Sequence, residues 1–164
     1  MCYNLKTYVY MSPVTYIFSE GSIHMKKDDC IFCKIANGEI PSDTVYEDEH
    51  FRAILDLSPA SKGHTLVLPK EHFDDALSAD EKTVGEIFKT AAKIAAAVKE
   101  TMNCDGINIV QNNGEAAGQT VHHLHVHIIP RYSSEKEKIV TWVQHESEPA
   151  EQKDIAARIA AKLS

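Results

Sequence analysis

Three histidines alternate with apolar residues in the second half of the chain. His123, His125 and His127 are separated by Leu124 and Val126. In a β-strand, residues two apart point to the same side, so three imidazoles would line one face while the apolar residues turn toward the core. Imidazole has its unperturbed pKa near neutrality, which suits it to act as a nucleophile, a proton carrier or a metal ligand. The spacing therefore predicts a chemical site.

A purely structural role is the alternative for this row. A single histidine on a strand is usually a satisfied structural residue, and a histidine-rich tract can be an adventitious metal site. Each buried ring nitrogen without a hydrogen-bond partner costs about 1–3 kcal/mol, so three of them do not stabilise an apolar strand. The regular interleaving with Leu124 and Val126 also differs from a simple tag. Both arguments favour a catalytic or metal-binding role for the three histidines over a purely structural one.

A second cluster begins with two cysteines. Cys30 and Cys33 form a Cys-x-x-Cys pair, whereas Cys2 and Cys104 are isolated. In a chain without a secretory signal this spacing indicates metal or redox chemistry before a structural disulfide. A thioredoxin-like redox pair opens a helix after a strand, and no segment of suitable hydrophobicity directly precedes Cys30. Metal binding is therefore favoured, with histidines as the missing ligands.

Composition limits the other possibilities. A chain of 164 residues with 43% hydrophobic residues can bury one good core. Its formal charge of -7 argues against a nucleic-acid polymer as partner, although a small nucleotide can be held by backbone N–H groups. No apolar run is long enough to cross a bilayer, so we expect no membrane association and a cytoplasmic location.

The pattern of elements predicts an α+β fold with an antiparallel sheet. We expect residues 1–24 to be an extension, either disordered or an artefact of the start position, with an extra strand as the alternative, and residues 25–164 to form a single domain. Asp29 is expected to cap a short helix over residues 30–37, and the capping-box spacing at Ser78 to Glu81 predicts the start of a long helix. The expected strands are 45–47, 51–57, 64–68, 106–110 and 121–129. The expected apolar face of the long helix consists of Val84, Ile87, Phe88, Ala91, Ile94, Ala95 and Val98. Ile155, Ile159 and Leu163 indicate an amphipathic helix near the C-terminus.

Several ordered motifs resemble the histidine triad (HIT) superfamily, in particular its bacterial Hint-like branch. The segment from His123 to Ile129 is similar to the triad signature, and it is preceded by the Gly-Gln-Thr-Val block that begins at Gly118. Upstream, the blocks Ile31 to Ile35, Gly38 to Pro41, Asp56 to Ser58 and Gly63 to Lys70 follow in the same order as in that branch. The resemblance covers the chain from about Cys30 onward.

The resemblance implies a HIT-type fold, with about five antiparallel strands, one long helix and short N- and C-terminal helices. It implies that the middle histidine, His125, is the nucleophile that attacks the α-phosphorus of a nucleotide derivative, giving a nucleotidyl-histidine that water then hydrolyses. The other residues that it places in the catalytic machinery are His127, His64, Gln119 and Thr120. Those that it places against the nucleotide are Asp56, Leu57, Phe32, Ile35, Asn112, Gln119, Thr120, His125 and His127.

Zinc-bearing members of this branch further imply a structural Zn²⁺ on Cys30, Cys33, His72 and His123. A closed Cys₂His₂ set is typical of structural rather than catalytic zinc. His122 and His50 are rival ligands, because the chain offers nine histidines and the cysteine pair does not choose among them.

The predicted function is that of a purine nucleoside phosphoramidase-like hydrolase acting on purine nucleotides or their conjugates. The alternatives are a Fhit-like dinucleoside polyphosphate hydrolase and a zinc-stabilised nucleotide-binding scaffold with incidental catalysis. The resemblance also implies a homodimer that pairs through the long helix at about 78–102 and the strand at about 106–111. The alanines at 91, 92, 95, 96 and 97 would allow a second helix to approach closely.

Overall fold

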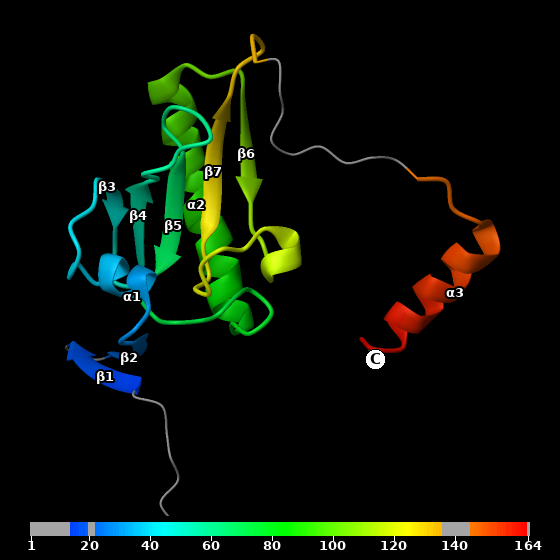
Figure 1. Ribbon diagram of the computed structural model, residues 1–164, viewed down its shortest axis with the longest axis horizontal. Coiled ribbons are helices and arrows are strands. Elements are labelled where there is room, and N and C mark those ends of the chain that lie inside the picture. The colour runs from blue at the N-terminus through cyan, green and yellow to red at the C-terminus, as the bar shows by residue number, and fades with distance from the viewer. Residues whose placement is uncertain (1–13, 20–21, 136–144, 164) are drawn as a thin grey trace, which may run out of the picture.

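The computed structural model describes residues 14–19, 22–135 and 145–163, with the main sheet at its centre (Figure 1). Five strands form an antiparallel sheet in the order β3-β4-β5-β7-β6. They are β3 (Thr44–Glu47), β4 (Phe51–Leu55), β5 (Thr65–Pro69), β7 (Val126–Arg131) and β6 (Gly106–Val110). The predicted five-stranded antiparallel sheet is therefore confirmed, although β4 ends two residues earlier than expected.

A separate hairpin precedes this sheet. Strands β1 (Val14–Ser19) and β2 (Ser22–Lys27) pair antiparallel and form a two-stranded sheet of their own. Residues 1–13 of the expected extension lie outside the described residues. The end of the hairpin is joined to the domain, because Met25 O accepts a hydrogen bond of 2.7 Å from His72 N and Lys26 forms an ion pair with Glu39.

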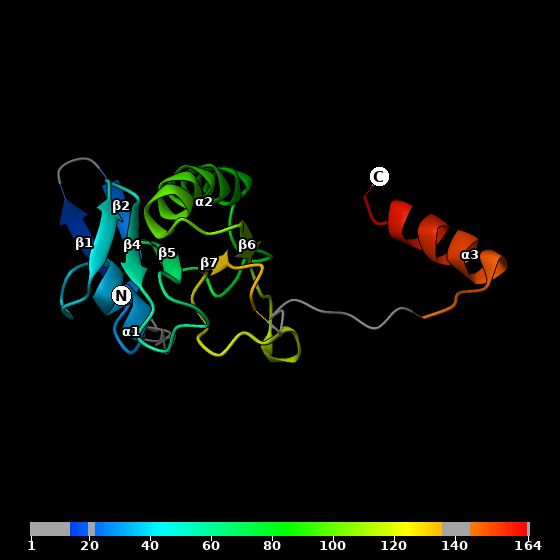
Figure 2. The same cartoon turned by 90° about the horizontal axis from the view of Figure 1, so that it is seen from above.

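The long helix α2 (Glu81–Met102) covers one face of the sheet, and the short helix α1 (Ile31–Ala36) lies on the other, as Figure 2 shows. The register explains this division. Ala53 pairs with Val67 and Val67 with Val126, and these three pack with α2 in one core cluster. The neighbouring Ile54 and Leu66 point the opposite way and pack beside α1.

The ends of both helices differ from the sequence prediction. Cys30, not Asp29, is the N-cap of α1, and its Sγ accepts a hydrogen bond from Cys33 N. Asp80, not Ser78, caps α2, and its carboxylate accepts a 2.9 Å hydrogen bond from Thr83 N. Ser78 is not available as a cap, because its backbone N–H and its hydroxyl are hydrogen-bonded to Asp75 in the preceding turn.

The histidine strand also starts later than predicted. Strand β7 begins at Val126, so His123 and His125 lie in the segment before it. In the observed register, Leu124 would come opposite Pro69, which has no N–H to donate. Leu124 N donates instead to Phe73 O at 2.7 Å, so the chain leaves the sheet at this point. The alternation still holds, because Leu124, Val126 and Ile128 are buried in the core on the α2 side.

The predicted C-terminal helix is present as α3 (Pro149–Ala160), and its residues are exposed. The predicted apolar face of α2 is only partly correct, since Phe88 is 40% exposed on its flank. Among the described residues, no helix is long and apolar enough to cross a membrane.

Candidate active site and metal centre

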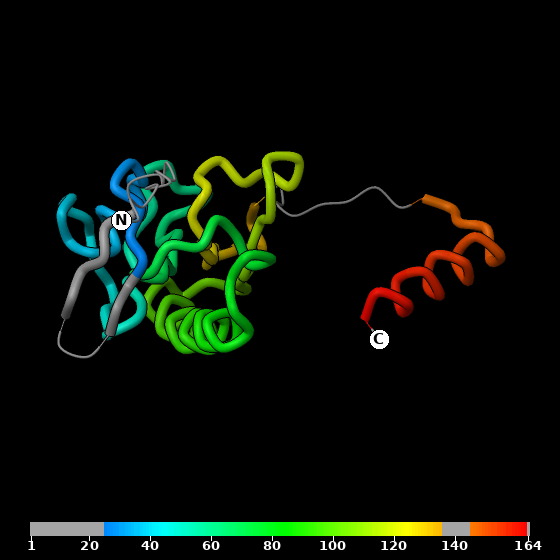
Figure 3. Tube along the Cα trace, turned by 90° about the horizontal axis from the view of Figure 1, so that it is seen from below, coloured from blue at the N-terminus to red at the C-terminus, as the bar shows by residue number. Residues whose placement is uncertain are grey.

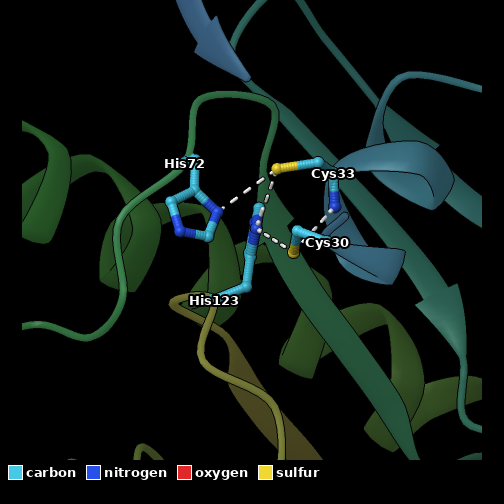
Figure 4. A group of neighbouring side chains, drawn as sticks. All are labelled: Cys30, Cys33, His72 and His123. Atoms are coloured by element: carbon cyan, nitrogen blue, oxygen red, sulfur yellow. Dashed lines mark hydrogen bonds between the residues drawn. The ribbon is translucent and has the colours of Figure 1, made fainter. Parts of the chain in front are cut away.

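Four side chains meet where α1 begins (Figure 4). Cys30 and Cys33 lie one helical turn apart, and His72 and His123 face them from two loops that pass the end of β5. All four ligand atoms lie within 4.8 Å of one another. The sequence analysis named the same four residues as metal ligands, and the fold places them together.

The distances fit a tetrahedral zinc site. His123 Nδ1 lies 3.5 Å from the Sγ atoms of both Cys30 and Cys33, and His72 Nδ1 lies 3.3 Å from Cys33 Sγ. Zinc binds thiolate sulfur and imidazole nitrogen at bond lengths that place such atoms about 3.5 Å apart on the edge of a tetrahedron. The donor set therefore matches a structural Cys₂His₂ site in both chemistry and spacing.

Outer hydrogen bonds orient both imidazoles toward this centre. His123 Nε2 donates to Pro69 O at 2.9 Å, and His72 Nε2 donates to Asp74 Oδ1 at 3.1 Å. With the proton held on Nε2, each Nδ1 presents its lone pair to the metal position, as in most histidine-bound zinc sites. Sequence reasoning missed Asp74, although its place two residues after His72 was a usable signal.

The two thiols share a hydrogen bond that separates their acidities. That bond lowers the pKa of Cys30 and raises the pKa of Cys33, and burial opposes the first effect and adds to the second. The rival histidines lie elsewhere. His122 is exposed with Nε2 3.7 Å from Glu115, and His50 packs edge-on beside Phe51. Neither belongs to the four-residue cluster.

The second site lies on the α1 side of the sheet, around His125. Its Nδ1 donates to His123 O at 2.6 Å. This bond fixes the neutral tautomer, so Nε2 carries a free lone pair. Burial lowers the pKa of His125, and the Phe32 ring packs edge-on against the imidazole with 5.2 Å between centroids. The ring thus presents Nε2 as an acceptor, and its burial favours the unprotonated form.

A pair of histidines stands beside it. His127 lies opposite Leu66 in the sheet and therefore on the α1 face, and its ring centroid is 4.9 Å from that of His125. His64 Nδ1 accepts a hydrogen bond from Ala60 N at 3.1 Å, so its Nε2 donates to His127 Nδ1 at 2.9 Å. His127 then carries its own proton on Nε2. The chain of hydrogen bonds thus leaves His127 with a donor for a substrate atom.

Burial is the main cause of a lowered pKa in all three rings. Burial lowers the pKa of His64, with Asp56 acting in the opposite direction. Burial, with the neighbouring His125 and His64, lowers the pKa of His127 to about 4. Imidazoles of this kind would hold an anionic phosphate mainly through directed hydrogen bonds and only weakly through net charge.

Asp56 stands at the end of β4, close to these histidines. Its Oδ2 lies 3.4 Å from His64 Nδ1, and its Oδ1 accepts a hydrogen bond from Ser58 N at 2.8 Å. The expected contact of Asp56 with the nucleotide and its structural role at the start of the Ser58 turn share this one carboxylate.

The apolar residues expected to contact the nucleotide differ in exposure. Leu57 is 92% exposed, whereas Ile35 is buried with Leu66 and Leu68 beneath α1. Phe32 contacts both His123 and His125 through its ring edge. Leu57 and Phe32 are therefore on the surface side of the site, and Ile35 supports the helix from the core.

The loop before the histidines is held by Gln119. Its side chain is only 2% exposed, Oε1 accepts from Gly114 N at 2.8 Å, and Nε2 donates to the carbonyls of Asp74 and Val121. Both amide hydrogens are used, so in this structure Gln119 shapes the loop instead of offering a hydrogen to a phosphate. Thr120 is exposed and Asn112 is half-buried, and Gly118 turns the loop with φ +90°.

The comparisons with known proteins agree with this fold. The model of the HIT domain family matches residues 37–134. A solved structure of a protein from Streptococcus mutans UA159 superposes with a TM-score of 0.81 at 40% sequence identity, covering 94% of this chain and all of that one. Protein hit of Bacillus subtilis is 42% identical over 139 residues, which are 84% of this chain and 96% of its own. The chain belongs to the HIT family.

Two further relatives bear on metal and chemistry. A zinc-bound histidine triad family protein from Mycobacterium smegmatis has a TM-score of 0.65 at 37% identity, covering 82% of this chain and 95% of its own. The Arabidopsis thaliana protein named adenylylsulfatase HINT3 is 39% identical over 116 residues, 71% of this chain and 57% of its own. Membership supports a nucleotide hydrolase or nucleotidyl transferase as the general class.

Proposed function

We propose that the protein hydrolyses purine nucleoside phosphoramidates or related nucleotide conjugates at the α-phosphate, with His125 as the nucleophile. One observation carries the proposal: the hydrogen bond from His125 Nδ1 to His123 O, which leaves Nε2 with its lone pair directed away from the backbone. A neutral, oriented imidazole is the activated form that attack on phosphorus requires.

The reaction takes two displacements. His125 Nε2 forms a bond to the α-phosphorus while the bond to the leaving nitrogen breaks, and the nitrogen leaves as an amine with a proton from the site. Water then adds to phosphorus, the bond to histidine breaks, and the proton that water gives up restores the one taken by the amine. The products are the nucleoside monophosphate and the amine, with one water consumed. His127 Nε2–H is placed to hydrogen-bond to a phosphoryl oxygen or to the leaving atom.

Mass spectrometry tests this proposal directly. Protein mixed with an adenosine phosphoramidate should release adenosine monophosphate and should show a covalent adenylyl adduct that maps to His125. His125→Asn should give neither, while still binding the monophosphate. Binding without turnover by the wild-type chain would contradict the proposal and favour the scaffold role.

The choice of substrate is tested by measuring turnover of two competing substrates in the same assay. The name of the Arabidopsis relative makes adenylyl sulfate one competitor, and a dinucleoside polyphosphate is the other. All three substrates present an α-phosphate with a different leaving group. We expect the highest kcat/KM for the phosphoramidate, and a preference above tenfold for either competitor would reassign the substrate class.

For the metal, we propose a structural zinc held by Cys30, Cys33, His72 and His123. Bound zinc would be a closed, charge-neutralised cross-link without catalytic chemistry. His123 connects the two sites, because its side chain faces the cysteines while its carbonyl accepts from His125. The metal ligand would therefore position the nucleophile.

We also propose that the protein is a homodimer built on α2 and β6. Strand β6 is an edge of the sheet, and Ile109 on it is exposed. Phe88, Ala92 and Ala96 follow at a spacing of four residues on one exposed flank of α2. An unpaired edge beside an apolar stripe suits a two-fold contact.

A further inference from the structure

An apolar groove runs along the other flank of α2. It lies between the second half of this helix and the β3–β5 side of the sheet, and its volume is about 550 Å³. Val45, Leu55, Ala97 and Val98 line it, and Val45 is 48% exposed. A single helix covers this face, so its β3 side keeps large apolar side chains in contact with water. Such a surface indicates an interaction site.

Helix α3 also exposes apolar side chains that have no covering surface in the described part of its own chain. Ile155 and Ile159 lie four residues apart on it, and Leu163 follows at the same spacing in the turn after Ala160. All three are exposed, with Ile159 at 57%. No residue of α3 is buried. A helix of 12 residues is marginal in water on its own, so it needs an apolar surface to cover this stripe.

The groove and the stripe match in length. The α2 residues that line the groove run from Lys93 to Met102, which corresponds to about 14 Å of helix. The stripe from Ile155 to Leu163 spans about 12 Å.

Their charges are also complementary. Lys62 and Lys93 lie at the rim of the groove, and Lys93 Nζ lies 4.7 Å from the Tyr46 ring centroid. At the start of α3, the N-cap Glu148 and Glu151 of the first turn lie on the side of the stripe. Within the described ranges none of these four charges has an ion pair, so each is available to the other surface.

We propose that α3 of one protomer docks in this groove on a second copy of the chain. Figures 2 and 3 view the molecule from opposite sides and agree that α3 stands clear of its own domain, beyond β6. The groove is lined by Val45 and Tyr46 of β3 and therefore lies on the other flank of α2. A partner placed across β6 would turn its own groove toward that region. The inference rests on the proposed dimer and adds an exchange of helices to it.

A basic amphipathic helix that lies on a membrane would look different. From Pro149 to Leu163, α3 and its end carry Glu151 and Asp154 against Lys153, Arg158 and Lys162, and Asp154 pairs with Arg158 at 3.6 Å. Membrane-surface helices instead concentrate lysine and arginine on the polar face. The mixed charge favours a protein surface.

Disulfide trapping in the full-length protein tests the exchange. In a Cys2→Ser background, the double variant Ala97→Cys, Ile159→Cys places one thiol in the groove and one on the stripe. Cys30, Cys33 and Cys104 are buried. Under mild oxidation we expect a reducible product of two chain masses on a denaturing gel. The matched control is Ala97→Cys, Ala157→Cys, because residue 157 lies on the opposite side of α3, and it should give at most a tenth of that product.

The other outcomes overturn the inference in distinguishable ways. A disulfide within one chain mass would place α3 in its own groove. Absence of a disulfide, with a dimer mass by light scattering, would leave the dimer standing and remove the exchange, and a monomer mass would remove both. Turnover of the phosphoramidate is measured on the same samples. We expect it to be unchanged, because the groove lies on the face of the sheet away from His125, and its loss would indicate a failed fold.

Discussion

At the scale of single residues, two hydrogen bonds to backbone carbonyls, one from each ring, give His123 and His125 different free nitrogens. The His123 ring has its Nε2 on Pro69 O and turns Nδ1 to the cysteines, whereas His125 has its Nδ1 on a carbonyl and frees Nε2. The same side chain therefore presents Nδ1 to the two thiols at one position and a free Nε2 two residues later, which suits the proposed roles of metal ligand and nucleophile. The choice is made by the nearest carbonyl oxygen.

Replacing His125 with Asn is expected to lower kcat by at least about three orders of magnitude. Asn cannot form the covalent intermediate, and loss of a nucleophile removes an interaction made only in the reaction. The dissociation constant for adenosine monophosphate, measured by calorimetry, should change by less than about fivefold. His122→Asn is the control, since this neighbouring side chain is exposed, and it should keep wild-type turnover.

The buried histidines predict that activity persists to an unusually low pH. Protonation of His125 removes its lone pair, so activity falls as the pH is lowered. Because burial lowers the pKa of His125 and lowers that of His127 to about 4, the fall should come below pH 6.5. The pH dependence of kcat/KM measures this, with circular dichroism at each pH to detect unfolding. A midpoint at 6.5 or above would contradict the assignment of a buried nucleophile.

The lowered pKa values of these histidines also make the folded state less stable as the pH falls. The unfolded chain takes up protons on these histidines near pH 6.5, and the folded chain takes up the proton of His127 near 4. Since the unfolded state binds more protons within this window, the free energy of unfolding decreases as the pH falls through it. Urea titrations at pH 7 and pH 5 should show a lower midpoint at pH 5. An equal or higher midpoint at pH 5 would be inconsistent with buried neutral rings.

At the scale of elements, the metal centre joins parts of the chain that share few other contacts. Lys27 N donates to Cys33 Sγ, so the end of β2 reaches α1, and His72 N donates to Met25 O beside it. His123 belongs to the segment that leads into β7. One ion would thus hold the hairpin, α1 and the histidine segment together.

Removing the metal is therefore expected to loosen this region first. Protein purified without a chelator should contain about one zinc per chain, and Cys33→Ser should lose it and lower the melting temperature by about 10 °C, because metal binding is folding free energy. Cys104→Ser is the control, since Cys104 is buried outside the metal cluster. Equal melting temperatures for the two variants would argue against a structural zinc.

At the scale of the whole molecule, the two flanks of α2 have separate roles in our proposals. The flank with Phe88, Ala92 and Ala96 faces a second α2, and the flank with Lys93 and Ala97 receives the partner's α3. Between them the buried stripe packs on the sheet. This arrangement accounts for a helix that has small or apolar side chains on three sides.

A charged side chain on the first flank should separate the dimer. Light scattering of the wild-type protein at micromolar concentration should give twice the chain mass. Phe88→Asp should shift it to the mass of one chain, because it places a charge where an apolar side chain would be buried. Leu77→Asp is the control, because it also changes an exposed apolar side chain but lies outside α2. This variant should remain dimeric. If Phe88→Asp also kept the dimer mass, this interface would be wrong.

The sequence by itself determined the class of fold and the ligand types. Alternation at His123 to Ile128 and the helical period of Ile87, Ala91 and Ile94 follow from backbone geometry, which is local and therefore readable. The Cys-x-x-Cys spacing predicts two neighbouring thiols for the same reason, and α1 brings them within 4.8 Å of each other. The motifs then identified the family, which the comparisons confirm.

Only the tertiary structure decided how the site is connected. Pro69 stops the ladder opposite Leu124, which takes His123 and His125 off the strand and gives each ring a different carbonyl. The His64 to His127 hydrogen bond and the choice of His72 over His50 join residues far apart in the chain. These features depend on packing between distant segments, and no short-range pattern records which hydrogen-bond partner a folded chain brings within 3 Å.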